Sequence, residues 1–407
     1  MSFQGAKINK LNGGLGRTAS SDRVIVLIAG MTLAGDLAYN TKYQLLDINA
    51  VEGLGITAST DDTNGELVHY HLSEMFRLAP ESTFWLIPVD KTKTVAELVA
   101  DDALKAAIRG IDNVNVFGIA GLSTPVASAL VDAVSFQSLV DSFLSEYLYI
   151  DGVFVEGVGG AVALAAADYD DLRTITAPNV SYVITQDPAV ATLNAAYAKR
   201  AAIGTVLGSV AVRKVHEDLG SVDIEEKPRS RRGQENYSLS DESLGRWLSA
   251  ALSDGTAFKS LTESEQRSLT AKGWMYVGSF ANYPGFYFNG CPTAVTKDSD
   301  YAYFNFNCIW NKAARLIRQT LIPRVRSKVP TDPQTGYLKS TWVSGSESSV
   351  SAALDAMVSA GNIEDKDVFI NPAQAIGEDV PLEIKCQLVV GRIVHEFSID
   401  LGLTNNI

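Results

Sequence analysis

The sequence predicts an α/β domain with a mostly parallel sheet, followed by an α+β region, with extended arms at both termini. Apolar strand-like runs alternate with helical runs from residue 23 to about 202. This alternation is typical of a parallel sheet covered by helices on both faces. Two helical segments and then two period-two runs follow near the C-terminus. The first 22 residues contain little that could pack in a core.

Composition and charge limit the partners that we expect. The 407 residues are 46% hydrophobic and 20% charged, as in soluble globular proteins, and the length suggests two or three domains. The net charge of −13 argues against nucleic acid and anionic membranes as general partners. The longest apolar run, residues 24–35, is too short to span a bilayer. We therefore expect no nucleic-acid binding and no membrane anchoring.

The cysteines and the N-terminus bear on the cellular compartment. Cys291, Cys308 and Cys386 are odd in number and far apart in the chain. They fit neither a disulfide framework nor a cysteine zinc site, which predicts a reducing compartment. The N-terminus lacks the apolar region of a signal peptide. Both observations therefore favour a reducing compartment for this protein.

The first half of the chain alternates strands and helices in a regular order. Val24 to Ala29 is a continuous apolar run, as in a strand buried on both faces. Residues 66–78 repeat apolar side chains at helical spacing, after turn-forming residues at 61–65. The same criteria predict further strands at 83–89, 114–119, 149–155 and 180–184, and further helices at 94–109, 125–147, 162–172 and 189–202.

The periodicity is weaker beyond residue 204. Residues 225–234 have the composition of a charged, solvated loop. A capping-box pattern at Thr262 and Glu265 predicts the start of a helix. Aromatic runs on both sides of the turn residues 282–285 indicate a β-hairpin.

A concentrated basic segment follows, from Ile309 to Val329. Apolar residues recur there at helical spacing until Pro323, which should end or kink the helix. No acidic residue occurs between Tyr301 and Thr331. This pattern in an acidic chain suggests a surface for a specific acidic partner, and a solvated charged face is the alternative. The cations are Lys312, Arg315, Arg318, Arg324, Arg326 and Lys328.

The chain should end in a helix and strands. A helix is predicted at 346–360, with a short strand at 367–370 after it. Apolar and polar residues then alternate over 382–390 and again over 393–401, which indicates two strands with one buried face each. The last strand could pair with the sheet edge of a neighbouring subunit, or form an ordinary terminal hairpin in its own domain. Its apolar face consists of Ile393, His395, Phe397, Ile399 and Leu401.

Signals for catalysis, cofactors and metals are weak. The glycine-rich run 157–162 has Val162 where a dinucleotide-binding motif needs glycine. His69 and His71 are two positions apart on one predicted helix and do not share a face for a metal ion. No nucleophile elbow and no His-Glu-x-x-His motif occurs. We therefore predict no catalytic, cofactor-binding or metal site, and an α/β enzyme with an unrecognised small-molecule site is the alternative function.

The order of these features resembles that of the contractile tail sheath proteins of bacteriophages and contractile injection systems. Residues 23–35 are similar to the family's opening strand and glycine turn, and 67–89 to its next helix and strand. Residues 268–290 resemble the stretch before the family's last long helices. The region 301–401 resembles the family's C-terminal order of helix, linker, helix and strands.

The resemblance implies a plan of domains. An N-terminal arm, residues 1–22, would precede an outer α/β domain, residues 23–256, with a variable region at about 90–250. An inner conserved sheath core, residues 257–390, would follow. A C-terminal strand or arm, residues 391–407, would end the chain.

The resemblance also implies a function without cofactor or nucleotide. Subunits would stack as rings, usually sixfold, around a tail tube and contract to drive the tube through a target envelope. The basic segment would face the tube, and the terminal arms would complete the sheets of neighbouring subunits. The implied partners are other copies of this chain, the tail tube protein, and baseplate and terminal cap proteins. The particle would be a virion tail or an injection particle, and a static tube or baseplate scaffold is a further alternative.

Overall fold

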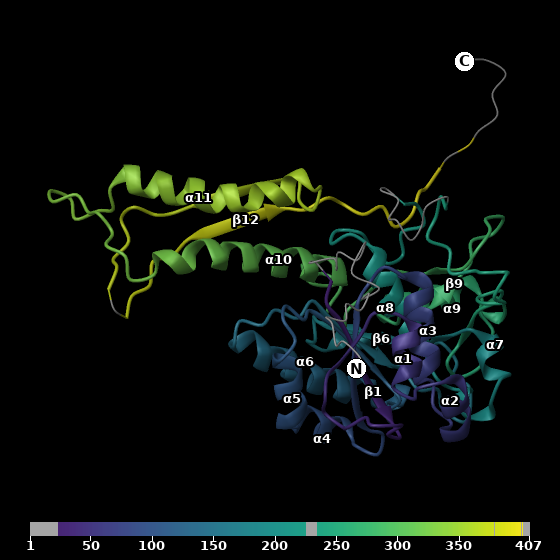
Figure 1. Cartoon of the computed structure of the whole chain (residues 1–407). Coiled ribbons are helices and arrows are strands. Elements are labelled where there is room, and N and C mark those ends of the chain that lie inside the picture. The colour runs from purple at the N-terminus through teal and green to yellow at the C-terminus, as the bar shows by residue number, and fades with distance from the viewer. Residues whose placement is uncertain (1–22, 225–233, 378, 400, 402–407) are drawn as a thin grey trace, which may run out of the picture. The chain divides into compact units, whose positions relative to one another are not determined.

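The computed structural model describes residues 23–224, 234–377, 379–399 and 401, which form two compact units (Figure 1). Unit 1 comprises the chain up to Arg213 together with Leu219–Cys308, and unit 2 comprises Lys214–Asp218 and the chain from Ile309. The predicted N-terminal arm, 1–22, and nearly all of the predicted charged loop at 225–234 lie outside the described residues.

The division between the units lies later than the expected boundary at 256/257. Residues 257–308 remain with unit 1 because they extend its core. Trp274 packs edge-to-face on Tyr182, with ring centroids 5.9 Å apart. The next residue, Met275, forms a parallel bridge with Val183. This stretch therefore extends the hydrogen bonding and packing of the first sheet.

A six-stranded sheet forms the centre of unit 1, in the order β2-β3-β1-β4-β5-β6. All neighbours are parallel except β2, which is antiparallel to β3 at one edge. The mostly parallel sheet predicted from the sequence is thus confirmed. Its strands are β1 (Ile25–Met31), β2 (Tyr43–Leu45), β3 (Phe84–Asp90), β4 (Val116–Ala120), β5 (Gly152–Glu156) and β6 (Val180–Val183).

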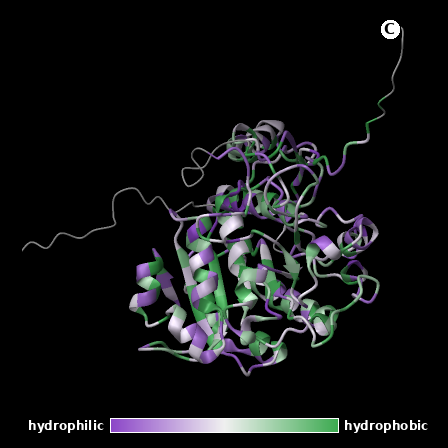
Figure 2. Ribbon diagram, turned by 90° about the vertical axis from the view of Figure 1, so that its right-hand side faces the viewer, coloured by the Kyte–Doolittle hydropathy of each residue, from purple (hydrophilic) through white to green (hydrophobic). Residues whose placement is uncertain are grey.

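Helices cover both faces of this sheet (Figure 1), and its strands are largely apolar (Figure 2). Two consecutive residues of β4 show how the faces differ, because successive side chains of a strand point to opposite sides. Phe117 packs on Phe143 of α6 at 6.1 Å between ring centroids. Gly118 leaves space for Leu207 of α8 on the other face. The helices are α1 (Ile48–Gly53), α2 (Ala58–Asn64), α3 (Val68–Leu78), α4 (Val95–Ala100), α5 (Asp102–Arg109), α6 (Ala129–Ser145), α7 (Pro188–Ala191), α8 (Ile203–Val212) and α9 (Glu263–Ala271).

Residues 126–145, which include α6, are long and apolar enough to cross a membrane by length and composition. They are the only such helix in the described part of the chain. Six apolar residues of α6 are nevertheless buried in the core of unit 1, as expected for a core helix. They are Ala129, Ala133, Phe136, Leu139, Val140 and Phe143.

Two short antiparallel ribbons complete unit 1. The first pairs β7 (Thr185–Gln186) with β8 (Ala251–Leu252). The second pairs β9 (Val277–Gly278) with β10 (Tyr287–Phe288), which confirms the aromatic hairpin at reduced length. The predicted capping box of α9 is also present, because Thr262 and Glu265 each bond the other's backbone N–H.

The predicted turn at 61–65 is wrong, because α2 occupies most of it. Thr57 and Thr60 form a reciprocal capping box that starts this helix, and Gly65 ends it in the left-handed conformation. The predicted single helix at 94–109 is interrupted at Asp101, whose carboxylate accepts backbone N–H groups from the first turn of α5.

The predicted helix at 162–172 is absent, and side chains from elsewhere bind its backbone instead. The Asp254 carboxylate accepts the N–H of Leu164 at 3.1 Å. The Lys272 ammonium donates to the carbonyl groups of Ala166, Ala167 and Tyr169. These bonds satisfy groups that a helix would otherwise pair, so the alanine-rich composition does not lead to a helix.

The predicted helix at 189–202 is also wrong. Only α7 and a 3-10 turn at Ala195–Tyr197 form there, and the long helix is α8, in the region where the periodicity was expected to weaken. Residues 203–210 of α8 are all buried. A helix that is buried all round has no polar face, so it lacks the amphipathic pattern by which helices are predicted.

Backbone contact between α8 and α3 requires glycine at position 204. A Cβ atom there would lie 2.2 Å from the carbonyl oxygen of His71, and that oxygen cannot rotate away. We expect Gly204→Ala to lower the free energy of unfolding by about 2 to 3 kcal/mol. Thermal or denaturant unfolding of the purified chain measures this loss.

Gly345 provides the matched control for that substitution. It lies inside the helix α11 (Ser340–Ser359), and a Cβ atom there would meet nothing within 4 Å. Gly345→Ala should stabilise the chain by about 0.5 to 1 kcal/mol, the usual gain in a helix interior. Equal effects of the two substitutions would contradict the packing argument.

Unit 2 contains the larger part of one long helix, from Ile309 on, together with a second helix and a two-stranded ribbon. Helix α10 (Phe304–Leu321) starts one turn earlier than expected and is followed by a 3-10 turn, Ile322–Arg324, at the predicted proline. Helix α11 is followed by the antiparallel strands β11 (Asp365–Phe369) and β12 (Lys385–Val389). The core of unit 2 includes Val343, Val350, Leu354, Met357 and Ile370.

Candidate assembly surfaces

The ribbon of β11 and β12 has one covered face. Lys366, Val368, Cys386 and Leu388 are half-buried on the side that contacts α11, and Lys366 forms an ion pair with Asp355 of that helix. The alternate residues are exposed on the other side, as the period-two pattern requires. The strands predicted at 367–370 and 382–390 are therefore present with other bounds, as β11 and β12, and they pair with each other.

The ribbon also has two open edges. The register runs from Asp365 opposite Val389 to Phe369 opposite Lys385. Among the described residues no other strand pairs with the outer edge of either strand. A two-stranded ribbon is marginal alone in water, and its free N–H and C=O groups are ready to pair with another strand.

The described residues after β12, 390–399 and 401, form no strand in the single chain. They continue away from β12 without turning back (Figure 1). The side chains of Phe397, Ile399 and Leu401 are 79%, 81% and 92% exposed, and His395 is exposed as well. The expected burial of one face of 393–401 is thus wrong for the single chain, and Ile393 alone is half-buried. The terminal hairpin, which was the alternative, is not formed by the described residues either.

Exposure of these apolar side chains to water is unfavourable in free energy. Burying a side chain such as Phe, Ile or Leu contributes about 1.5 to 3 kcal/mol, and here three of them alternate along one run without cover. Apolar surface of this kind on a soluble chain usually marks an interaction site. Pairing with a neighbouring subunit remains a prediction for these residues.

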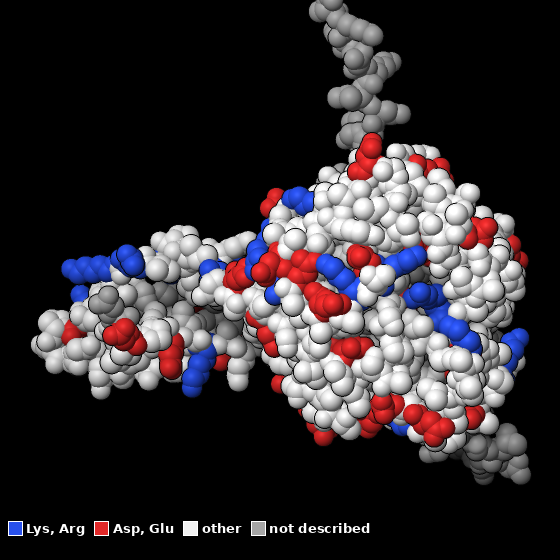
Figure 3. Space-filling view, turned by 90° about the horizontal axis from the view of Figure 1, so that it is seen from below, with Lys and Arg blue, Asp and Glu red and all other residues white. Residues whose placement is uncertain are grey.

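The cations of the basic segment fall into two groups. Lys312, Arg315 and Arg318 are spaced by three on α10, so they share one side of that helix, where they are half-buried. Arg324, Arg326 and Lys328 follow the helix and are exposed. Lys and Arg side chains are visible on the surface of unit 2 in Figure 3, with Asp and Glu side chains beside them. Contact of this segment with a tube remains a prediction.

Arg324 has a structural contact that the sequence did not indicate. Its guanidinium donates to the Ser349 hydroxyl at 2.6 Å and lies 3.4 Å from that of Ser346, both on α11. This links the end of α10 with the second helix of unit 2. Arg326 and Lys328 are therefore the better positions for testing charge without disturbing this contact.

Arg23 is fixed in the core at the point where the predicted N-terminal arm joins unit 1. Its Nη1 lies 3.5 Å from a carboxylate oxygen of Asp151 and 2.9 Å from the sulfur of Cys308. Its guanidinium also lies 5.2 Å from the ring centroid of Phe304. These partners hold the buried guanidinium of Arg23 in the core of unit 1.

The histidines have separate environments. His69 lies 3.4 Å from Glu52, whereas His71 is buried and its Nδ1 accepts the N–H of Gly204 at 3.3 Å. His216 belongs to unit 2, where the side chain of Asn362 contacts its ring at 3.2 Å. Among the described residues, no group of three His, Cys, Asp or Glu side chains could hold a metal ion.

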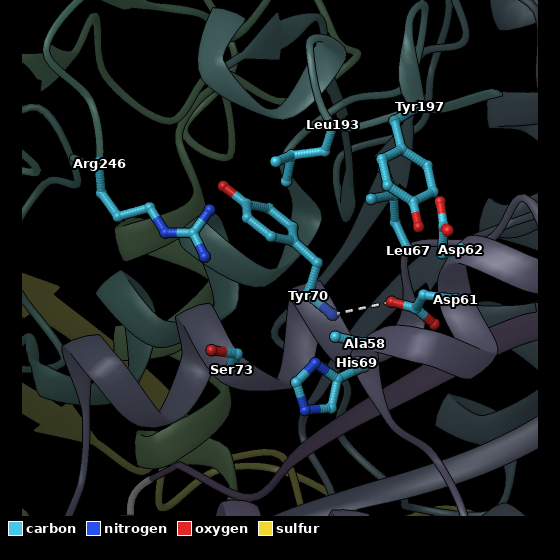
Figure 4. Close-up of a pocket in the computed structure, with 10 residues that line it drawn as sticks. All are labelled: Ala58, Asp61, Asp62, Leu67, His69, Tyr70, Ser73, Leu193, Tyr197 and Arg246. Atoms are coloured by element: carbon cyan, nitrogen blue, oxygen red, sulfur yellow. Dashed lines mark hydrogen bonds between the residues drawn. The ribbon is translucent and has the colours of Figure 1, made fainter. Parts of the chain in front are cut away.

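A hollow of about 350 Å³ lies beside α3 in unit 1 (Figure 4). Its charged groups are engaged in the fold. Asp61 accepts the N–H of Tyr70 at 3.0 Å and caps α3. Burial raises the pKa of Asp61 to about 7, and backbone N–H groups of α3 oppose this. Arg246 lies 4.6 Å from the Tyr70 ring centroid and 3.7 Å from Glu74. We therefore interpret these groups as structural.

Comparisons with known proteins cover the whole chain. The family model described as DUF2586, N-terminal domain, matches residues 3–291, and that described as DUF2586, C-terminal domain, matches residues 300–407. No curated protein matches the chain.

Solved structures of contractile particles have a similar fold. The helical sheath of the anti-feeding prophage in its contracted state aligns with a TM-score of 0.63 and 15% identity, over 100% of both chains. A chain of the sixfold-symmetrised baseplate of that particle aligns with a TM-score of 0.61 and 13% identity, again over 100% of both chains. The PVC sheath complex of an extracellular contractile injection system, also in its contracted state, aligns with a TM-score of 0.57 and 14% identity. The alignment covers 100% of this chain and 98% of that one. The predicted resemblance to contractile sheath proteins is confirmed in the fold.

Proposed function

Because the chain belongs to the DUF2586 family and has the fold of contractile sheath proteins, we propose that it is the polymerising subunit of a contractile sheath. The sheath would enclose a tail tube, and its contraction would drive the tube through a target envelope. This role needs no cofactor and no nucleotide. The subunits would assemble in the bacterial cytoplasm and become part of a virion tail or an injection particle.

The observation that supports this proposal most is a complementary pair of features in one chain. The ribbon of β11 and β12 has open edges of five residues each. The segment 393–401 has nine residues of alternating character and exposed apolar side chains. At about 3.3 Å per residue the segment is longer than such an edge, so it could pair along all of it. Each subunit therefore has both a donor strand and an acceptor edge.

A contact between a strand of one subunit and an edge of the next is head-to-tail. Such a contact does not close on itself unless the rotation happens to complete a ring, so it can generate stacked rings and a helix. The single-residue alternation of 393–401 would fix the register, because a slip by one residue would expose the apolar face. We infer rings of six subunits joined in this way, with the N-terminal arm as a second link.

The basic segment would face the tube. Exposed cations attract an acidic surface over about 8 Å at physiological salt, so this contact could form and break without strand exchange. During contraction the tube contacts would break while the strand pairing persists. The work would come from a lower-energy packing of the same subunits, held back by a kinetic barrier. Baseplate and terminal cap proteins would control the two ends.

A static scaffold of the tube or baseplate is the second candidate function. The likeness to a baseplate chain of the anti-feeding prophage, with a TM-score of 0.61 over 100% of both chains, favours it. The two functions differ in geometry, because a sheath has an extended and a contracted packing of one subunit and a scaffold has only one.

Electron microscopy of the full chain tests the proposal. Negative-stain images over a range of concentrations, with and without the tail tube protein, should contain hollow tubes with cogwheel cross-sections. Tubes of two diameters and pitches would identify a contractile sheath. A single geometry in all conditions would identify the scaffold, and dispersed particles even with the tube protein would contradict both functions.

A further inference from the structure

The parallel sheet of unit 1 has a place where such sheets commonly bind ligands. After β1 the chain forms β2 and β3 on one side of β1 and then crosses to β4 on the other side. In open α/β sheets, ligands bind outside the carboxyl ends of the strands at such a reversal. Lys91 follows the carboxyl end of β3, and Gly121 follows that of β4. Glu156 is the last residue of β5.

A cavity of about 200 Å³ lies at that place. These three residues line it together with Glu66, His71 and Arg200. All of them belong to unit 1, so the cavity is independent of unit 2 and of the proposed polymer contacts. Pockets for drug-sized ligands measure roughly 300 to 1,000 Å³, so only a small ion or molecule would fit here.

The acidic groups around the cavity are already paired. Glu156 accepts the N–H of Gly121 at 2.8 Å and that of Ala201 at 3.2 Å, and Nη1 of Arg200 at 3.2 Å. Glu66 accepts through Oε1 from the N–H and hydroxyl of Thr32 at 2.8 and 2.7 Å, and from Lys91 at 2.8 Å. The second oxygen of Glu66 is the remaining acceptor. These bonds hold the carboxylates in place and neutralise their charge.

His71 contributes a neutral imidazole ring to the lining of the cavity. Burial and the nearby Arg200 lower the pKa of His71 to about 3, so its ring is neutral. Its Nδ1 accepts the N–H of Gly204, so the proton of the neutral ring must lie on Nε2. The side chain lines the cavity, and its Nε2 has no hydrogen-bond partner among the described residues. A ligand with an acceptor atom could therefore take this donor.

Two cations add further donors. Arg200 uses Nη1 for the Leu122 carbonyl group and for Glu156, which leaves Nε and Nη2 without a partner in the described part of the chain. The Lys91 ammonium gives one hydrogen to Glu66 and retains two. The unused side-chain groups of these residues are thus mostly donors, which suits a ligand rich in acceptors.

We propose that this cavity binds a small oxyanion, a carboxylate or a phosphate, between Lys91, Arg200 and the Nε2–H of His71. The ligand would occupy a charge-balanced, partly enclosed site, so its affinity should be modest. It would tie the ends of β3 and β5 to α3 and thereby stabilise unit 1. Neither polymerisation nor contraction is needed for this binding.

Equilibrium dialysis of the purified full chain tests the site. Radiolabelled inorganic phosphate and, in a separate arm, radiolabelled acetate are titrated at constant ionic strength, which suppresses general charge attraction. We expect saturable binding of at least one of them, with one site per chain. Lys91→Met removes the ammonium but keeps the aliphatic stem, and it should weaken binding about tenfold, as for loss of a charge-assisted hydrogen bond.

Two further variants make the result decisive. Lys91→Arg keeps the charge and should keep binding, so it separates loss of the cation from loss of folding. Lys105→Met is the matched control, because Lys105 lies on α5 outside the cavity and pairs only loosely, at 3.9 Å, with Asp102. No saturable binding of either anion would overturn the proposal. So would equal affinities of Lys91→Met and the unchanged chain, or an equal loss in Lys105→Met.

Discussion

A chain that ends at Arg392 should fold as well as the full-length protein but should not form tubes. The deleted residues 393–407 include the exposed side chains of Phe397, Ile399 and Leu401, which contribute little to the stability of their own subunit. We expect the free energy of unfolding to change by less than about 0.5 kcal/mol, as for other surface positions. In a polymer these side chains would each contribute about 2 kcal/mol by burial.

The loss of assembly should be large. Every 1.4 kcal/mol changes an equilibrium constant about tenfold, and part of the burial energy is spent on ordering the segment. The critical concentration for tube formation should therefore rise at least about a hundredfold. Light scattering and electron microscopy over a concentration series measure it, and circular dichroism measures stability. Normal tubes from the shortened chain would refute strand exchange by these residues.

Single substitutions test whether tube formation depends on one defined face of this segment, which the deletion alone cannot show. Phe397 and Ser398 are adjacent, and in a paired strand their side chains would point to opposite faces. Phe397→Asp should prevent tubes because it places a charge in the buried face of the pair. Ser398→Asp adds the same charge next to it and should be tolerated. Equal impairment by both would indicate a charge effect without a defined face.

Reversal of the basic segment should separate tube attachment from sheath formation. We expect Arg315→Glu with Arg318→Glu to form sheath-only polymers but to assemble poorly on the tail tube, because like charges would then face each other. Co-sedimentation with the tube protein at low salt measures attachment. Raising the salt to about 1 M, where the screening length is near 3 Å, should weaken attachment of the unchanged chain in the same way.

Control variants are needed because Arg315 and Arg318 are half-buried on α10. Arg326→Glu with Lys328→Glu reverses two exposed cations of the same segment and should also impair attachment. Lys105→Glu with Lys259→Glu makes the same change in net charge in unit 1 and should leave attachment intact. Unchanged attachment in both variants of the basic segment at low salt would remove the electrostatic explanation.

The elements that the sequence identified well have a strong local pattern. The five parallel strands are runs of apolar residues, and α3 shows its buried face through Leu72, Met75 and Phe76. The end of α10 follows from Pro323, and the start of α9 from the Thr262 capping box. In each case the physical cause lies within a few residues, so a reading of the sequence can find it.

Other elements depend on residues far away in the chain. Helix α8 has no polar face, and its position is fixed by contact of Gly204 with the backbone of α3. The alanine-rich segment 162–172 resembles a helix locally, yet Asp254 and Lys272 bind its backbone in another form. Local composition does not contain these partners, and tertiary contacts override propensity where they supply better hydrogen bonds.

The assembly surfaces divide in the same way. The sequence by itself determined that 382–390 and 393–401 alternate in polarity, that the cations gather after Ile309, and that no strong catalytic motif is present. Only the tertiary structure decided that β12 pairs with β11, that Phe397 and its neighbours remain uncovered, and that His71, Lys91 and Arg200 surround one cavity. The reason is that periodicity indicates which face of a segment is apolar and favours burial. The partner that buries this face is determined by the path of the whole chain.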